Sequence, residues 1–144
     1  MIKDSIDFID VDKFDKSHHD VLFRILNSRK YNISHDRKVN YEDHILFVKN
    51  NPYQNWCIVK NKDSTLGCFY ITYDNYIGVS LINEEKSIYK NIIAKIFREY
   101  KPNPKIDSVR RESFCINSNP NNIILQDALE EIGLRIIQVT FSSL

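Results

Sequence analysis

Glycine is scarce in this chain: only Gly67, Gly78 and Gly133 occur among its 144 residues. Loops that cradle a phosphate group usually contain glycine, because a Cβ atom would keep the phosphate away from the backbone. The turn at residues 83–89, between a strand-like run and a long helical pattern, contains none. A phosphate bound at this turn would have to reach backbone N–H groups beside two carboxylates, those of Glu84 and Glu85.

Cysteine is also rare, and Cys57, Cys68 and Cys115 are widely and irregularly spaced. An odd number of cysteines in unpatterned positions predicts neither a disulfide framework nor a metal site. Each lies in a strand-like apolar run, where a free cysteine behaves as a small buried hydrophobic residue. We therefore expect buried thiols in a reducing cytosol, and no metal.

The chain has no excess of charge of either sign and no long apolar run. Its formal net charge is +1, which gives no attraction to nucleic acid or to an anionic membrane surface. No run reaches the length of a transmembrane helix, and the first residues, with Lys3, Asp4 and Asp7, do not resemble a signal peptide. These absences predict a cytoplasmic protein with no nucleic-acid or membrane partner.

The length predicts one domain, residues 1–144. Apolar residues recur with a period of about two where we expect strands, and at helical spacing where we expect helices. The expected strands are residues 6–11, 55–60, 66–73, 76–82, 108–116 and 134–141, and the expected helices are residues 18–29, 41–50, 84–100 and 123–132. Ser17 and Asn40 are placed to cap the first two helices, and Gly133 is placed to end the last one in a left-handed conformation. Short turns make the middle three strands antiparallel, and the strand entered through a helix is expected to run parallel to its neighbour.

The predicted order, βααβββαβαβ, describes an α+β fold with a mixed central sheet and helices on both faces. Several local sequences accompany this order. They are Tyr41-Glu42-Asp43-His44, Trp56-Cys57-Ile58-Val59, Asp74-Asn75-Tyr76-Ile77-Gly78-Val79, the frame Asn117-x-x-Pro120-x-Asn122 with Gly133-Leu134, and the closing run Ile136-Ile137-Gln138-Val139-Thr140. Taken in order, they resemble the GNAT superfamily of N-acetyltransferases. They are most similar to small bacterial members that act on amino sugars of surface polysaccharides, including nonulosonic-acid pathways.

The resemblance implies direct transfer of an acetyl group from acetyl-CoA to a small amine, such as an amino sugar. It places the cofactor along the fourth strand, at the start of the following helix and beside the last helix. The implied cofactor-binding residues are Val79, Leu81, Lys86, Ser87, Ile88, Asn117 and Asn122. Gly78 would mark either a bulge that opens the sheet or a close approach to the backbone.

Two departures from the family pattern lie in this region. The turn before the long helix lacks the family's glycines, and the tyrosine that often serves as the acid corresponds to Leu129, which cannot donate a proton. Tyr89 or Tyr100 could replace it, although both fit the apolar face of their helix. The turn also has an ordinary structural interpretation, in which Asn83 caps the helix and acidic residues complement its dipole.

Histidine is the side chain best suited to proton transfer near neutral pH, so His44 and His35 are the candidate catalytic residues. His44 follows two carboxylates on the second helix and matches a family position. His35 lies in a polar loop that lines the acceptor side in the family. Each has a simpler alternative, a solvated histidine on a loop or on an exposed helix face.

Two interpretations therefore stay open. The first is an acetyl-CoA-dependent N-acetyltransferase, and the second is an inactive GNAT-like binding or partner module that no longer binds acetyl-CoA. With a single closing strand the sheet keeps an open edge, and such an edge can pair with a strand of another chain. A homodimer is therefore an option.

Overall fold

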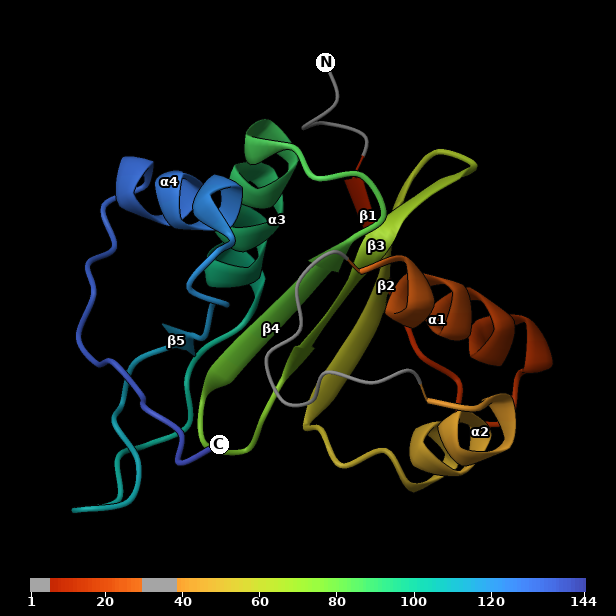
Figure 1. The fold of residues 1–144 in the computed structure, drawn as a ribbon, viewed down its shortest axis with the longest axis horizontal. Coiled ribbons are helices and arrows are strands. Elements are labelled where there is room, and N and C mark those ends of the chain that lie inside the picture. Colours follow the sequence, from red (N-terminus) through yellow and green to blue (C-terminus); the bar gives the residue numbers. More distant parts are fainter. Residues whose placement is uncertain (1–5, 30–38) are drawn as a thin grey trace.

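The computed structural model describes residues 6–29 and 39–144 (Figure 1). Its elements follow the order βααβββαβα. They are β1 (Ile6–Asp10), α1 (Lys16–Ser28), α2 (Tyr41–Asn50), β2 (Asn55–Asn61), β3 (Ser64–Ile71), β4 (Tyr76–Leu81), α3 (Lys86–Glu99), β5 (Cys115–Ile116) and α4 (Ile123–Glu131). The α+β class and the mixed sheet between helices are as predicted.

The sheet has five strands in the order β1-β2-β3-β4-β5. The first four are antiparallel, which confirms the pairing expected from their short turns. β5 pairs in parallel with β4, as expected for a strand that is entered through a helix. Only β1 and β5 are edge strands among the described strands.

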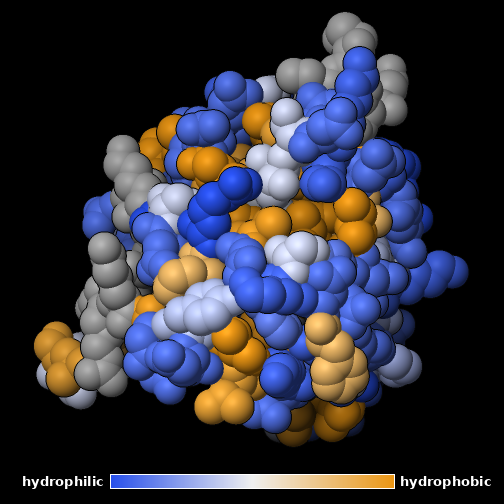
Figure 2. All heavy atoms as spheres, turned by 90° about the vertical axis from the view of Figure 1, so that its right-hand side faces the viewer, coloured by the Kyte–Doolittle hydropathy of each residue, from blue (hydrophilic) through white to orange (hydrophobic). Residues whose placement is uncertain are grey.

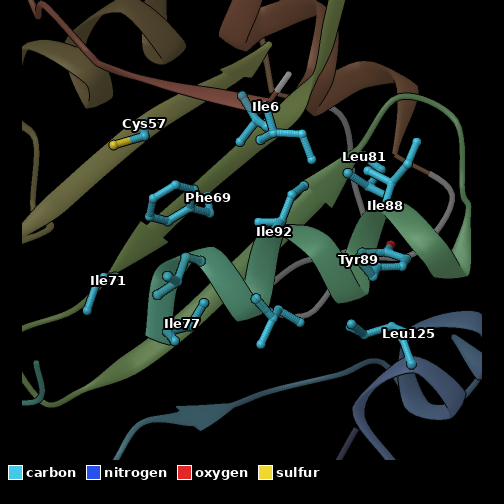
Figure 3. Packing of buried hydrophobic residues seen from close by; sticks show 14 residues of the cluster. Ile6, Cys57, Phe69, Ile71, Ile77, Leu81, Ile88, Tyr89, Ile92 and Leu125 are labelled. Atoms are coloured by element: carbon cyan, nitrogen blue, oxygen red, sulfur yellow. The ribbon is translucent and has the colours of Figure 1, made fainter. Parts of the chain in front are cut away.

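Side chains of β2 alternate between two apolar layers. Cys57 and Val59 face a large core that includes α3 and α4, whereas Trp56 and Ile58 face a smaller one with residues of α1 and α2. Figure 3 shows the larger core, where labelled side chains of the sheet lie opposite α3. Seen from the α1 and α2 side, the surface is mostly hydrophilic with separate apolar patches (Figure 2).

The helix caps are partly as predicted. Asn40 caps α2, since its side-chain oxygen accepts a hydrogen bond from the Asp43 N–H at 2.8 Å. The predicted Ser17 cap is wrong: Asp15 caps α1 and accepts from the Ser17 N–H at 2.8 Å. The Ser17 hydroxyl also donates to the Asp15 carboxylate, at 2.6 Å, so Ser17 binds the capping residue and is not the cap itself.

The strand predicted at residues 134–141 does not form. A strand needs a neighbour to pair with, and β5 supplies only two paired residues instead of the nine predicted at 108–116. The missing part of that strand contains a tight turn, in which the Ile106 and Arg110 backbones exchange hydrogen bonds of 2.9 and 2.8 Å. The apolar side chains of the last segment are exposed, Val139 by 69% and Phe141 by 91%.

Candidate functional site

β4 and β5 diverge soon after they meet. The Cys115 N–H donates to the Asn75 carbonyl at 3.0 Å, and the ladder contains the pairs Tyr76–Cys115 and Ile77–Ile116. No further pair joins the two strands within the described part of the chain. Residues 78–81 of β4 therefore have no partner strand on the side of β5 and form an open strand edge inside the fold (Figure 1).

The backbone groups of Val79 and Leu81 point toward this open edge. In an antiparallel pair, successive residues turn their N–H and C=O groups alternately toward and away from the partner strand. The Tyr76 carbonyl accepts from Thr72 at 2.8 Å and the Ile82 N–H donates to Leu66 at 2.9 Å, so even-numbered residues face β3. The odd-numbered residues of β4 consequently face the side from which β5 has diverged.

A small cavity lies beside this edge. Its walls include residues from β4, α3 and the α4 start: Val79, Leu81, Glu84, Tyr89, Asn119 and Asn122. Its volume is about 20 Å³, enough for about one water molecule. Of the residues predicted to bind the cofactor, Val79, Leu81 and Asn122 meet here, whereas Asn117 does not line the cavity and is exposed.

The N-terminus of α3 has no side-chain cap. Glu85 occupies the capping position with extended backbone, φ −140° and ψ 129°, and makes no capping hydrogen bond. The N–H groups of Lys86, Ser87 and Ile88 find no acceptor among the described residues. α1, α2 and α4 are all capped by a side chain. The predicted self-capping by Asn83 is wrong, and the unpaired donors and the helix dipole favour an anion.

Three residues that line the cavity, Glu84, Tyr89 and Asn122, are joined by hydrogen bonds. The Tyr89 hydroxyl donates to the Glu84 carboxylate at 2.8 Å, and Asn122 Nδ2 donates to the Tyr89 hydroxyl at 3.5 Å. Asn122 also caps α4, because its side-chain oxygen accepts from the Leu125 N–H at 3.1 Å. Figure 3 shows Tyr89 between Leu81 and Leu125. Its ring belongs to the core, while its hydroxyl faces the cavity.

The remaining predicted residues of α3 have other surroundings. The Lys86 and Lys90 ammonium groups lie 2.5 and 3.0 Å from the two Glu131 carboxylate oxygens, which joins α3 to α4. The hydrogen bond with Glu131 raises the pKa of Lys86. The Ser87 side chain is exposed and that of Ile88 is buried, so these two residues offer the site only backbone groups.

His44 belongs to α2, where its ring packs against α1 and it is only 4% exposed, so the predicted exposed-helix alternative is wrong. Its ring centroid is 5.4 Å from that of Phe23, and its Nε2 is buried without a hydrogen-bond partner. Burial lowers the pKa of His44, a shift that a hydrogen bond with the His19 backbone opposes. His44 does not line the cavity, and its catalytic role stays a prediction. His35 lies outside the described residues.

Gly78 allows a close approach to the sheet. A Cβ atom there would lie 2.2 Å from the ring of Tyr70, the cross-strand neighbour. The Tyr70 ring stacks on Tyr53, with centroids 4.0 Å apart and an interplanar angle of 8°. The predicted alternative of a bulge is wrong, since the register shift lies between Val59 and Lys60 on β2.

Three residues of the cavity have roles that the sequence does not indicate. From the sequence Glu84 is only a repulsive charge, although its spacing from Tyr89 along the turn allows their hydrogen bond. Asn119 lines the cavity in place of the expected Asn117, and no pattern in the sequence indicates this role. Arg29, at the end of α1, reaches the cavity across the sheet, which no local pattern indicates.

Two features are missing from the described residues, 6–29 and 39–144. No group of three or more His, Cys, Asp or Glu side chains in these ranges could hold a metal ion. No helix in the same ranges is both long enough and apolar enough to cross a membrane.

Two solved structures share the fold of this chain. No protein-family model and no curated protein matches this sequence. An acetyltransferase from Thermus thermophilus has a similar solved structure, with a TM-score of 0.63 and 11% identity, over 96% of this chain and 92% of that chain. A possible acetyltransferase from Clostridium difficile aligns with a TM-score of 0.57 and 10% identity, over 96% of both chains. The chain has the same fold as these proteins.

Proposed function

We propose that this chain is an acetyl-CoA-dependent N-acetyltransferase that acetylates a small amine, such as an amino sugar, by direct transfer. One observation carries the proposal: the open edge of β4 leads directly to an uncapped helix N-terminus. An open strand edge suits the amide groups of a pantetheine arm, and free N–H groups at the start of a helix suit a pyrophosphate. The shared fold with two solved structures named as an acetyltransferase and a possible acetyltransferase supports the same conclusion.

The backbone of this chain fits the cofactor, whereas the side chains leave little space. Val79 and Leu81 would hold the pantetheine amides, and the N–H groups of Lys86, Ser87 and Ile88 would hold the pyrophosphate. A cavity of about 20 Å³ is too small for the cofactor arm, so Glu84 must move aside when it binds. Acetyl-CoA would supply the thioester from which the acetyl group is transferred.

Tyr89 is the residue of this chain best placed to hold a proton at the site. Its hydroxyl donates to Glu84 and accepts from Asn122, and Asn122 can hold it in place once Glu84 has moved aside. Leu129, at the family's usual acid position, packs against the core and has no proton to give. Tyr100 is less suited, because its hydroxyl lies 3.6 Å from the Cys57 sulfur. We assign the acid to Tyr89.

The alternative is a catalytically inactive module of the same fold. The hydrogen bond between Glu84 and Tyr89, the small cavity and Leu129 favour it. In this case the Glu84–Tyr89 pair would be permanent, and the protein would act through binding to a partner.

Amine-dependent release of coenzyme A thiol distinguishes the two. The purified chain is incubated with acetyl-CoA and, in turn, glucosamine, galactosamine, lysine and spermidine, and free thiol is measured. We expect at least one amine to raise the rate above the amine-free control. Tyr89→Phe should lower that rate by about a hundredfold, the lower range for loss of a general acid, with Tyr100→Phe as the matched control. A rate that no amine raises supports the inactive module.

A further inference from the structure

Arg29 is the one cation that lines the cavity within the described residues. It follows the last residue of α1, with extended backbone at φ −61° and ψ 133°. Its Nε atom is buried and makes no hydrogen bond. A buried guanidinium N–H without a partner is costly, and its natural partner is a carboxylate or phosphate oxygen.

The protein itself supplies no such partner among the residues that the structure describes. Glu84 lines the same cavity, but its carboxylate accepts from Tyr89, and none of the ion pairs in these residues includes Arg29. Within the described residues, the Arg29 Nε–H is therefore a hydrogen-bond donor with no acceptor, and an oxyanion could supply one.

Arg29 approaches the cavity from the α1 and α2 face of the sheet. Tyr53, Cys68 and Tyr70 pack in the apolar cluster on that face. Burial raises the pKa of each of these three residues, and the positive charge of Arg29 opposes each rise. Tyr89 and Leu125 reach the same cavity from the α3 and α4 face.

This arrangement separates two anion sites. The free N–H groups at the start of α3, which we assign to the cofactor pyrophosphate, belong to one face of the sheet, and Arg29 belongs to the other. We propose that Arg29 binds an oxyanion of the acceptor, so that the substrate carries a carboxylate or phosphate group in addition to its amine. This inference rests on the proposed acetyltransferase function, whose site it shares. The planar fork of arginine recognises either oxyanion through paired hydrogen bonds.

Three probes that share an amino-sugar ring test this assignment: glucosamine, glucosamine 6-phosphate and glucosaminuronic acid. Each is titrated into the full chain by NMR in the presence and absence of coenzyme A. We expect at least one anionic probe to bind about tenfold or more tightly than glucosamine, the effect of a charge-assisted hydrogen bond. Arg29→Gln should remove this preference, Arg29→Lys should keep part of it, and Arg24→Gln, an exposed arginine on the same helix, should keep all of it.

Acetyl-CoA binding by the same variants distinguishes this inference from the proposed function. We expect Arg29→Gln to bind acetyl-CoA as tightly as the unmodified chain. If Arg29→Gln weakens acetyl-CoA instead, the arginine serves the cofactor and the acceptor assignment is overturned. Equal or undetectable binding of all three probes also overturns it, whether or not acetyl-CoA binds.

Discussion

The Tyr89 hydroxyl donates a hydrogen bond to the Glu84 carboxylate at 2.8 Å, across the start of α3. This contact places a carboxylate of the chain itself in the cavity beside the open edge of β4. Glu84 thereby lies next to the start of α3 without accepting from its unpaired N–H groups, and the contact with Tyr89 must break if acetyl-CoA binds.

Removing the two carboxylates before α3 should tighten acetyl-CoA binding. At contact distance in water, two unit charges repel by about 1 kcal/mol, so Glu84→Gln combined with Glu85→Gly should lower the dissociation constant by about fivefold for each carboxylate removed. The effect should shrink at high salt because screening removes the repulsion. Calorimetric titration at two salt concentrations measures both effects, with Glu99→Gln near the far end of α3 as the control. An unchanged dissociation constant argues against a phosphate site at this turn.

Gly78 and Gly67 should differ in their tolerance of alanine. The added Cβ of Gly78→Ala meets the Tyr70 ring at 2.2 Å, and this ring can shift at the expense of its stack on Tyr53. We expect a loss of about 1–3 kcal/mol in the free energy of unfolding, the usual cost of overpacking. Gly67→Ala meets the Ser80 backbone oxygen at 2.0 Å and should lose more. Urea unfolding measures both, and the reverse order would contradict the described packing.

His44 should make the fold less stable in mild acid. Burial lowers its pKa from the ordinary value of 6.5, so below that pH the unfolded chain binds more protons than the folded one. Stability should therefore fall as the pH decreases from about 7.5 to about 5.5, and His44→Gln should flatten this dependence. Urea unfolding across this range provides the check, and parallel curves would refute it. If the variant also keeps full turnover, His44 has no catalytic role.

The exposed apolar segment at residues 134–144 bears on the predicted homodimer. Ile137, Val139 and Phe141 alternate with polar residues and are 50, 69 and 91% exposed. Such a segment suits pairing with the edge of a second copy. We expect sedimentation velocity to give twice the 17.1 kDa mass. Val139→Asp with Phe141→Asp should give the monomer mass, and a monomeric unmodified chain at every concentration would exclude this pairing.

Most of the fold follows from patterns within each element. Asn40 before the apolar residues of α2, the short turns between the middle strands and Gly133 after α4 each predict what the structure contains. Gly133 has φ +96°, the left-handed conformation that ends a helix. These signals succeed because the interactions they reflect lie within a few residues of each other.

Most failures concern interactions between distant segments, whereas the wrong caps at Ser17 and Asn83 are local errors of two residues. The run at residues 134–141 has the composition of a strand, but a strand forms only where another strand presents an edge of sufficient length. Asn83 is of a residue type that often caps helices, yet Glu85 occupies the capping position of α3. Arg29 lines the same cavity as β4 only because α1 packs over the face of the sheet, next to β3 and β4. No spacing in the sequence indicates that these residues come together.

Acetyl-CoA binding tests the central claim most directly. The purified chain is titrated with acetyl-CoA in a calorimeter, and a second titration uses acetylpantetheine, which lacks the pyrophosphate. We expect micromolar affinity for acetyl-CoA and much weaker affinity for acetylpantetheine, because in our proposal the unpaired N–H groups of α3 hold the phosphates. No heat of binding at millimolar acetyl-CoA would contradict the account, and the open edge of β4 would then serve another partner.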